Sequence, residues 1–231
     1  MNFISNRVAS VVLAVAAILA LTACSAVGDA LNQPPQTEYT QAEAYAPMEA
    51  VAAEAVESLT DFPGFEQRSW GEMPCSHNGI DDPDYTNIEI DYSFSLEVSE
   101  TDQIREDYVE ELREYWTAQG YEITRDEEST YDDRLDRNLV VRTDDGITLW
   151  YRVAGYVGLV IQSGCVPVSD LSEIEYVPPI GGIEPGGEGD KLDRYFPDGI
   201  PTDQAAAVDP FANTQAGPAP FDSPGSYDNL L

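Results

Sequence analysis

Apolar and polar residues alternate most regularly between residues 87 and 98, where every second position is apolar. The apolar positions are Ile88, Ile90, Tyr92, Phe94, Leu96 and Val98. A period of two predicts a strand with one buried face and one solvated face, as in a sheet that is covered on one side only.

Two other segments repeat apolar residues at helical spacing. Over residues 102–119 the stripe consists of Ile104, Tyr108, Leu112, Tyr115, Trp116 and Gln119. Gly120 then suits the left-handed position that ends a helix. Residues 46–59 show a weaker pattern, in which Pro47 takes the first helical position. One face there carries Met48, Val51, Ala52, Ala55 and Leu59, and the acids Glu49, Glu54 and Glu57 lie elsewhere.

Four short strands are predicted after the second helix, at residues 121–125, 138–143, 147–153 and 156–165. Asp144-Asp145-Gly146 is a strong turn signal and predicts a hairpin between the second and third of them. Residues 60–86 and the acidic stretch 126–137 are predicted to be irregular. Strand, helix and then four strands predict an α+β domain with a mostly antiparallel sheet of about five strands, one main amphipathic helix packed on it and an N-terminal helix.

The N-terminus carries an export signal. An apolar run from Val8 to Leu21 follows Arg7 and leads into Leu21-Thr22-Ala23-Cys24. A positive start, an apolar core and a small-residue cleavage site are typical of a secretory signal. Cysteine directly after the site makes it a lipobox, in which Cys24 becomes the lipidated N-terminus. We therefore expect a lipid-anchored protein on the outer face of the cell membrane.

The predicted organisation has four parts. Residues 1–23 are the signal peptide, and residues 24–41, small, polar and proline-containing, are a flexible tether. Residues 42–178 form the single α+β domain. Residues 179–231 are rich in proline and glycine and poor in aliphatic side chains, which predicts a disordered acidic tail.

Charge restricts the partners. The chain has 43 acidic and 11 basic residues, for a net charge of −32. Such a chain repels nucleic acid and anionic lipid head groups. The predicted helix 102–119 presents an acidic ridge of Glu106, Glu110 and Glu114, widened by Asp107 and Glu111. The ridge is either a solvated face, the commoner outcome, or a surface that attracts a basic envelope protein.

The two remaining cysteines, Cys75 and Cys165, are predicted to form a disulfide, because the compartment is oxidising. The bridge would close a loop of about 90 residues. On the chain-entropy model such a loop stabilises the fold by about 4–5 kcal/mol.

These features together resemble a family of small surface lipoproteins from high-GC Gram-positive bacteria, to which no reaction is assigned. The resemblance rests on the lipobox, the acidic tether, a helix ending in Trp116 and Gly120-Tyr121-Glu122-Ile123, Asp145-Gly146 between two strands, and Gln162-Ser163-Gly164-Cys165-Val166. It covers roughly residues 1–25 and 42–170. It implies the fold and the location described above, and no catalytic residue.

No catalytic motif in the sequence is complete. Ser163-Gly164-Cys165 is similar to the nucleophile phrase of cysteine transpeptidases, but one residue is missing from the phrase and the arginine expected after the cysteine is absent. A thiolate nucleophile also needs an adjacent base, and His77 is the only histidine. There is no Gly-x-Ser-x-Gly motif. With so many acids, no pair of carboxylates can be nominated for glycoside hydrolysis.

Two oxygen-rich stretches are candidate calcium loops. The first comprises Asn78, Asp81, Asp82, Asp84 and Asn87, and the second Asp132, Asp133 and Asp136. Neither has the spacing of an EF-hand, so a solvated loop is the favoured interpretation. The sequence predicts a non-catalytic membrane-anchored lipoprotein without a cofactor. The alternatives are a divalent-cation-binding lipoprotein and, last, a cell-wall-modifying cysteine enzyme.

Overall fold

Seven strands form one mixed sheet in the computed structural model, which describes residues 37–77, 79–131 and 134–200. The strands are β1 (Gln67–His77), β2 (Ile80–Ser93), β3 (Glu122–Tyr131), β4 (Arg134–Arg142), β5 (Thr148–Val153), β6 (Val157–Pro167) and β7 (Asp190–Lys191). Their order is β3-β4-β5-β6-β2-β1-β7. Only β1 and β7 pair in parallel within the described sheet. The predicted α+β class is confirmed, although the sheet is larger than expected.

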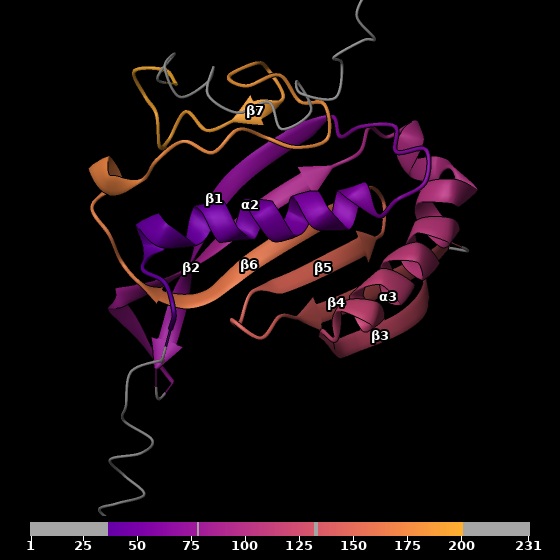
Figure 1. Cartoon of the computed structure of the whole chain (residues 1–231), viewed down its shortest axis with the longest axis horizontal. Helices are drawn as coiled ribbons and strands as arrows, with labels where there is room; N and C mark the ends of the chain where they lie inside the picture. The colour runs from indigo at the N-terminus through magenta and orange to yellow at the C-terminus, as the bar shows by residue number, and fades with distance from the viewer. Residues whose placement is uncertain (1–36, 78, 132–133, 201–231) are drawn as a thin grey trace, which may run out of the picture.

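The path of the chain explains this order (Figure 1). A hairpin of β1 and β2 leads into the helical segment that ends with α3 (Tyr108–Gln119), which returns the chain to the far edge of the sheet. The meander from β3 to β6 then brings β6 back beside β2. The predicted hairpin across residues 144–146 is confirmed as the turn between β4 and β5.

Both described α-helices pack on one face of the sheet (Figure 1). α2 (Gln41–Glu57) lies across β2 and β6, and α3 lies near β4. The core between the layers includes Ile88, Ile90 and Tyr92 of β2, with Leu112 and Trp116 of α3. The alternating burial predicted for β2 is confirmed over residues 86–92. Leu96 is 70% exposed, because the chain has left the sheet after Ser93.

α2 begins before the predicted residue 46. The Thr40 hydroxyl accepts from the Glu43 amide while the Glu43 carboxylate accepts from the Thr40 amide, which is a complete capping box. Pro47 is therefore inside the helix, and the prediction that it starts the helix is wrong. Glu49 was expected away from the packed face, yet it is 3% exposed. Glu49 is instead part of a buried ionic cluster with Arg68.

The second helix confirms the prediction for residues 102–119 apart from its first turns. A π-helical turn spans Gln103–Asp107 before the regular helix α3. Gly120 ends the helix with φ of 83°, in the left-handed region that glycine adopts without strain. The buried side chains of α3 are Tyr108, Val109, Leu112 and Trp116.

Two stretches predicted to be irregular are strands. Residues 67–77 form β1, and residues 80–86 extend β2 beyond its predicted start. Residues 126–131 and 134–137 are paired as the hairpin of β3 and β4. Opposite charges face each other along that hairpin, and Glu128 lies across from Arg137 at 3.2 Å. Cross-strand pairs of this kind stabilise a sheet without the apolar alternation that identifies a strand in a sequence.

The predicted disordered tail is wrong for its first part. Ile183, Leu192 and Tyr195 are buried in the core, and β7 pairs with β1 at the edge of the sheet. The domain therefore extends at least to Ile200. The signal peptide, Cys24, most of the tether and residues 201–231 lie outside the described residues. Within the described residues, no helix has the length and apolar character needed to span a membrane.

Candidate functional site

Cys75 of β1 and Cys165 of β6 lie at disulfide distance, with 5.7 Å between their Cα atoms. The two strands flank β2 on either side, and the ladder between β1 and β2 is irregular near Cys75. The pairing predicted from the compartment is therefore present. While this bond holds, the sulfur of Cys165 is not a free nucleophile. The side chain of His77, the base considered for it, lies outside the described part of the structure.

The acidic ridge, called the α3 ridge below, is exposed as predicted at Glu106 of the π-helical turn and at Glu110 and Glu114 of α3. Its central member is not a free charge. Glu110 is paired with Arg113 and lies 3.7 Å from Arg137. Arg113 also donates two hydrogen bonds to Asp126 of β3, at 2.7 and 2.9 Å. These pairs reduce the negative potential of the ridge.

The members of the candidate calcium loops that the structure describes are held in contacts within the protein. Asp81, Asp82 and Asp84 belong to β2, where Asp81 accepts from Ser76 at 2.7 Å and Asp82 accepts from the amide of Asp84 at 3.0 Å. Asp136 accepts from Arg134 at 2.8 Å. Asn78, Asp132 and Asp133 lie outside the described residues. Across residues 37–77, 79–131 and 134–200 no group of three His, Cys, Asp or Glu side chains is arranged to hold a metal ion.

A buried ionic cluster was not predicted. The guanidinium of Arg68, fully buried on β1, donates to Glu49 of α2 at 2.7 Å and to Asp190 of β7 at 2.7 and 2.9 Å. It also donates to the carbonyl of Val177 at 2.7 Å and lies 5.1 Å from the ring centre of Trp70. One side chain therefore joins α2, β1 and the C-terminal segment.

The two carboxylates of this cluster have further donors. Tyr92 donates to Glu49 at 2.5 Å, and Tyr176 donates to Asp190 at 2.7 Å. Burial raises the pKa of Glu49, against the opposing effects of the Arg68 charge and the hydrogen bonds. The charged and polar groups are thus satisfied by one another. Such a cluster fixes the packing of the elements it joins, and it leaves no oxygen directed at a ligand.

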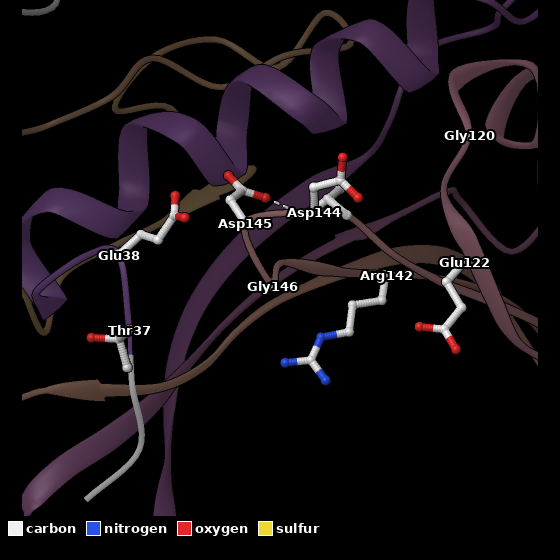
Figure 2. A pocket seen from close by; sticks show the side chains of 9 residues that line it. Thr37, Glu38, Gly120, Glu122, Arg142, Asp144, Asp145 and Gly146 are labelled. Atoms are coloured by element: carbon white, nitrogen blue, oxygen red, sulfur yellow. Dashed lines mark hydrogen bonds between the residues drawn. The ribbon is translucent and has the colours of Figure 1, made fainter.

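A polar cavity of about 580 Å³ lies where three segments meet. Its lining residues are Thr37, Glu38, Gly120, Glu122, Arg142, Thr143, Asp144, Asp145 and Gly146. Figure 2 shows Glu38 from the chain before α2, Asp144 and Asp145 from the β4–β5 turn, and Arg142 and Glu122 from paired strands around it. Four carboxylates and one guanidinium give the lining of this cavity an excess of negative charge.

One of these carboxylates is already occupied. Tyr39 donates to Asp145 at 2.7 Å, and the Thr143 hydroxyl donates to its other oxygen. The bond to Asp145 raises the pKa of Tyr39 to about 12. Burial raises the pKa of Asp145, but the hydrogen bonds from Thr143, Tyr39 and the backbone together outweigh it, and the net shift of the pKa is downward. The carboxylates left for a ligand are those of Glu38, Glu122 and Asp144, all on exposed residues.

The comparisons with known proteins give no family to this chain: no family model, no curated protein and no solved structure matches it. The site must therefore be argued from its own chemistry. The cavity is not predictable from local sequence patterns, because its residues come from positions 37–38, 120–122 and 142–146. The available signal was the predicted turn at residues 144–146, which already carried two acids.

Proposed function

We propose that this chain is a membrane-anchored, extracytoplasmic lipoprotein without catalytic activity, which presents its acidic α+β domain to a basic component of the cell envelope. The observation that carries the proposal is the lipobox ending in Cys24. The disulfide-distance pair of Cys75 and Cys165 supports it, because such pairs persist in oxidising compartments.

The net charge of the whole chain supports the choice of a basic partner. A net charge of −32 repels anionic molecules and attracts cationic ones over distances of about one Debye length, roughly 8–10 Å at physiological salt. The acidic cavity adds a local concentration of carboxylates at one position on the surface. We place the partner there rather than on the α3 ridge, because the central Glu110 of the ridge is neutralised by arginines.

Lipidation tests the anchor. Metabolic labelling with a fatty-acid analogue should mark the wild-type protein and leave Cys24→Ala unlabelled, because the thiol of Cys24 receives the lipid. Durable attachment needs two acyl chains, so the variant should also move from the membrane fraction to the medium. Cys75→Ala is the matched control and should keep the label. Fatty acid retained on Cys24→Ala would exclude this anchor.

A further inference from the structure

The edge strand β3 differs from the opposite edge of the sheet. At the β1 edge, β7 pairs with β1 at Arg68 and Ser69, and β1 carries Pro74 beside an irregularity in its ladder. Such features protect an edge from pairing with another chain. β3 pairs with β4 on one side and with no described strand on the other. Residues 122–130 are all exposed, and the strand contains no proline.

The backbone of β3 is suited to accept a strand. From Arg125 to Tyr131 its register with β4 is uninterrupted. In an antiparallel ladder, every second residue of an edge strand turns its N–H and C=O groups away from its partner. Among the described residues, none of the backbone bonds made outside helices and strands involves residues 122–131. The free edge therefore offers a row of donors and acceptors to an extended peptide.

Charge decides which strand can pair there. β3 carries Glu122, Asp126, Glu127 and Glu128 against Arg125. Asp126 and Glu128 pair with Arg113 and Arg137, so the acids that carry the charge of the edge are Glu122 and Glu127. Glu127 remains 67% exposed, although it lies 3.7 Å from Arg125. A second copy of β3 paired in parallel and in register would place each acid against itself, which is unfavourable across a strand pair. A strand rich in lysine or arginine would find opposite charges instead.

The acidic cavity lies at the beginning of this edge. Glu122, the first residue of β3, is also one of its lining residues, as is Gly120 just before the strand. Glu38 and Asp144 supply further carboxylates, and in the described part of the chain no salt bridge with an Arg or Lys occupies them. In strand addition, the main chain provides affinity and side-chain pockets provide specificity. The edge and the cavity together provide both.

We propose that the free edge of β3 binds an extended, lysine- or arginine-rich segment of another protein as an additional strand, with one basic side chain in the cavity lined by Glu38, Glu122 and Asp144. This inference rests on the proposed function for the class of partner, and it assigns the place and the mode of binding. Negative charge on the edge blocks pairing between copies of the chain and admits a cationic strand.

The test uses the full mature protein, purified in a non-ionic detergent, and a fluorescent peptide of alternating lysine and valine. Fluorescence anisotropy should give saturable binding. A peptide with the same charge but with two internal valines replaced by proline should bind roughly tenfold more weakly or worse, because it lacks two N–H donors. Hydrogen exchange should slow at residues 122–131 when the alternating peptide binds.

Two double variants that each remove two negative charges distinguish binding at the cavity from attraction by the net charge of the whole protein. Glu122→Gln with Asp144→Asn should weaken peptide binding several-fold. Glu106→Gln with Glu114→Gln, on the α3 ridge, should bind as the wild type does. Both should melt close to the wild-type temperature, because the substituted residues are exposed.

The proposal is overturned if the proline peptide binds as tightly as its parent, if both variant pairs weaken binding equally, or if no peptide binds. The first two results would show attraction by net charge alone. None of these measurements depends on lipidation. Failure of the Cys24 labelling would therefore reject the anchor while leaving a positive peptide result intact, and the reverse also holds.

Discussion

Arg68→Met is expected to lower the free energy of unfolding by about 3–5 kcal/mol, the cost of removing one partner from a buried ion pair. The substitution keeps a long side chain but leaves Glu49 and Asp190 buried without their positive charge. The carbonyl of Val177 also loses its donor. Urea unfolding followed by tryptophan fluorescence measures the change, because Trp70 lies beside the cluster. A loss of this size is a large share of the stability of one domain.

Two further variants separate charge from packing. Arg194→Met removes a cation that pairs with Glu72 at 2.7 Å but is 66% exposed, and should change stability by less than about 1 kcal/mol. Adding Glu49→Gln and Asp190→Asn to Arg68→Met should recover part of the loss, because no uncompensated charge then remains. If Arg68→Met and Arg194→Met unfold at the same urea concentration, the buried cluster stabilises the fold no more than an exposed ion pair does.

The double variant Cys75→Ala with Cys165→Ala is expected to lose about 4–5 kcal/mol on the chain-entropy model, because the bridge closes a long loop in the unfolded chain. The two cysteines are separated by 90 positions in the sequence. Cys75 is buried, so loss of packing at its sulfur adds to the effect. Thermal melting of the purified protein, with and without a reductant, provides the measurement.

Thiol titration supplies the control for that experiment. In the Cys24→Ala chain only Cys75 and Cys165 remain, and the unreduced, denatured protein should show no reactive thiol. The reductant should lower the melting temperature of the wild type and leave that of the double variant unchanged. Reactive thiols in the unreduced protein would contradict the bridge and restore Cys165 as a candidate nucleophile.

The part of the fold that the sequence predicted is the part held by local, apolar patterns. Alternation along β2, the stripe of α3 and the turn before Gly146 each need only neighbouring residues to be recognised. Gly120 was also correctly predicted at the end of α3, because the left-handed conformation depends on the residue itself and glycine adopts it without strain.

β1 could not be predicted because its inner face begins with a charge. Arg68 and Trp70 point to the core, and Arg68 is acceptable there only because Glu49 and Asp190 surround it. These partners lie 19 and 122 positions away along the chain. A rule based on local hydrophobicity therefore places Arg68 at the surface. The same distant partnership explains why the sequence wrongly predicts a disordered tail for residues 179–200. Asp190 pairs with Arg68, and neighbouring side chains of this segment complete the core, but neither contact leaves a local pattern.

The candidate site was predictable in chemistry but not in place. The excess of acids is explained by solubility alone or by a cationic partner, and it excludes nucleic acid and anionic lipid as partners. Which acids would remain free depended on the arginines of β3, β4 and α3, and these pairs form only when the strands are in register. The cavity forms only because the chain before α2 lies against the β4–β5 turn, where Tyr39 bonds to Asp145.

The bond from Tyr39 to Asp145 also has a mechanical consequence. Glu38 and Tyr39 come just before the capped start of α2, and Tyr39 is attached to the β4–β5 turn. If the protein is held by a lipid at Cys24, tension between membrane and domain reaches the described part of the fold from its N-terminal side, where Tyr39 bonds to another segment. The Tyr39–Asp145 bond would take the load first, so that the capping box of α2 is shielded from it. A pulling force on the envelope would then extend the predicted tether before it unwound α2, whose packing is part of the core.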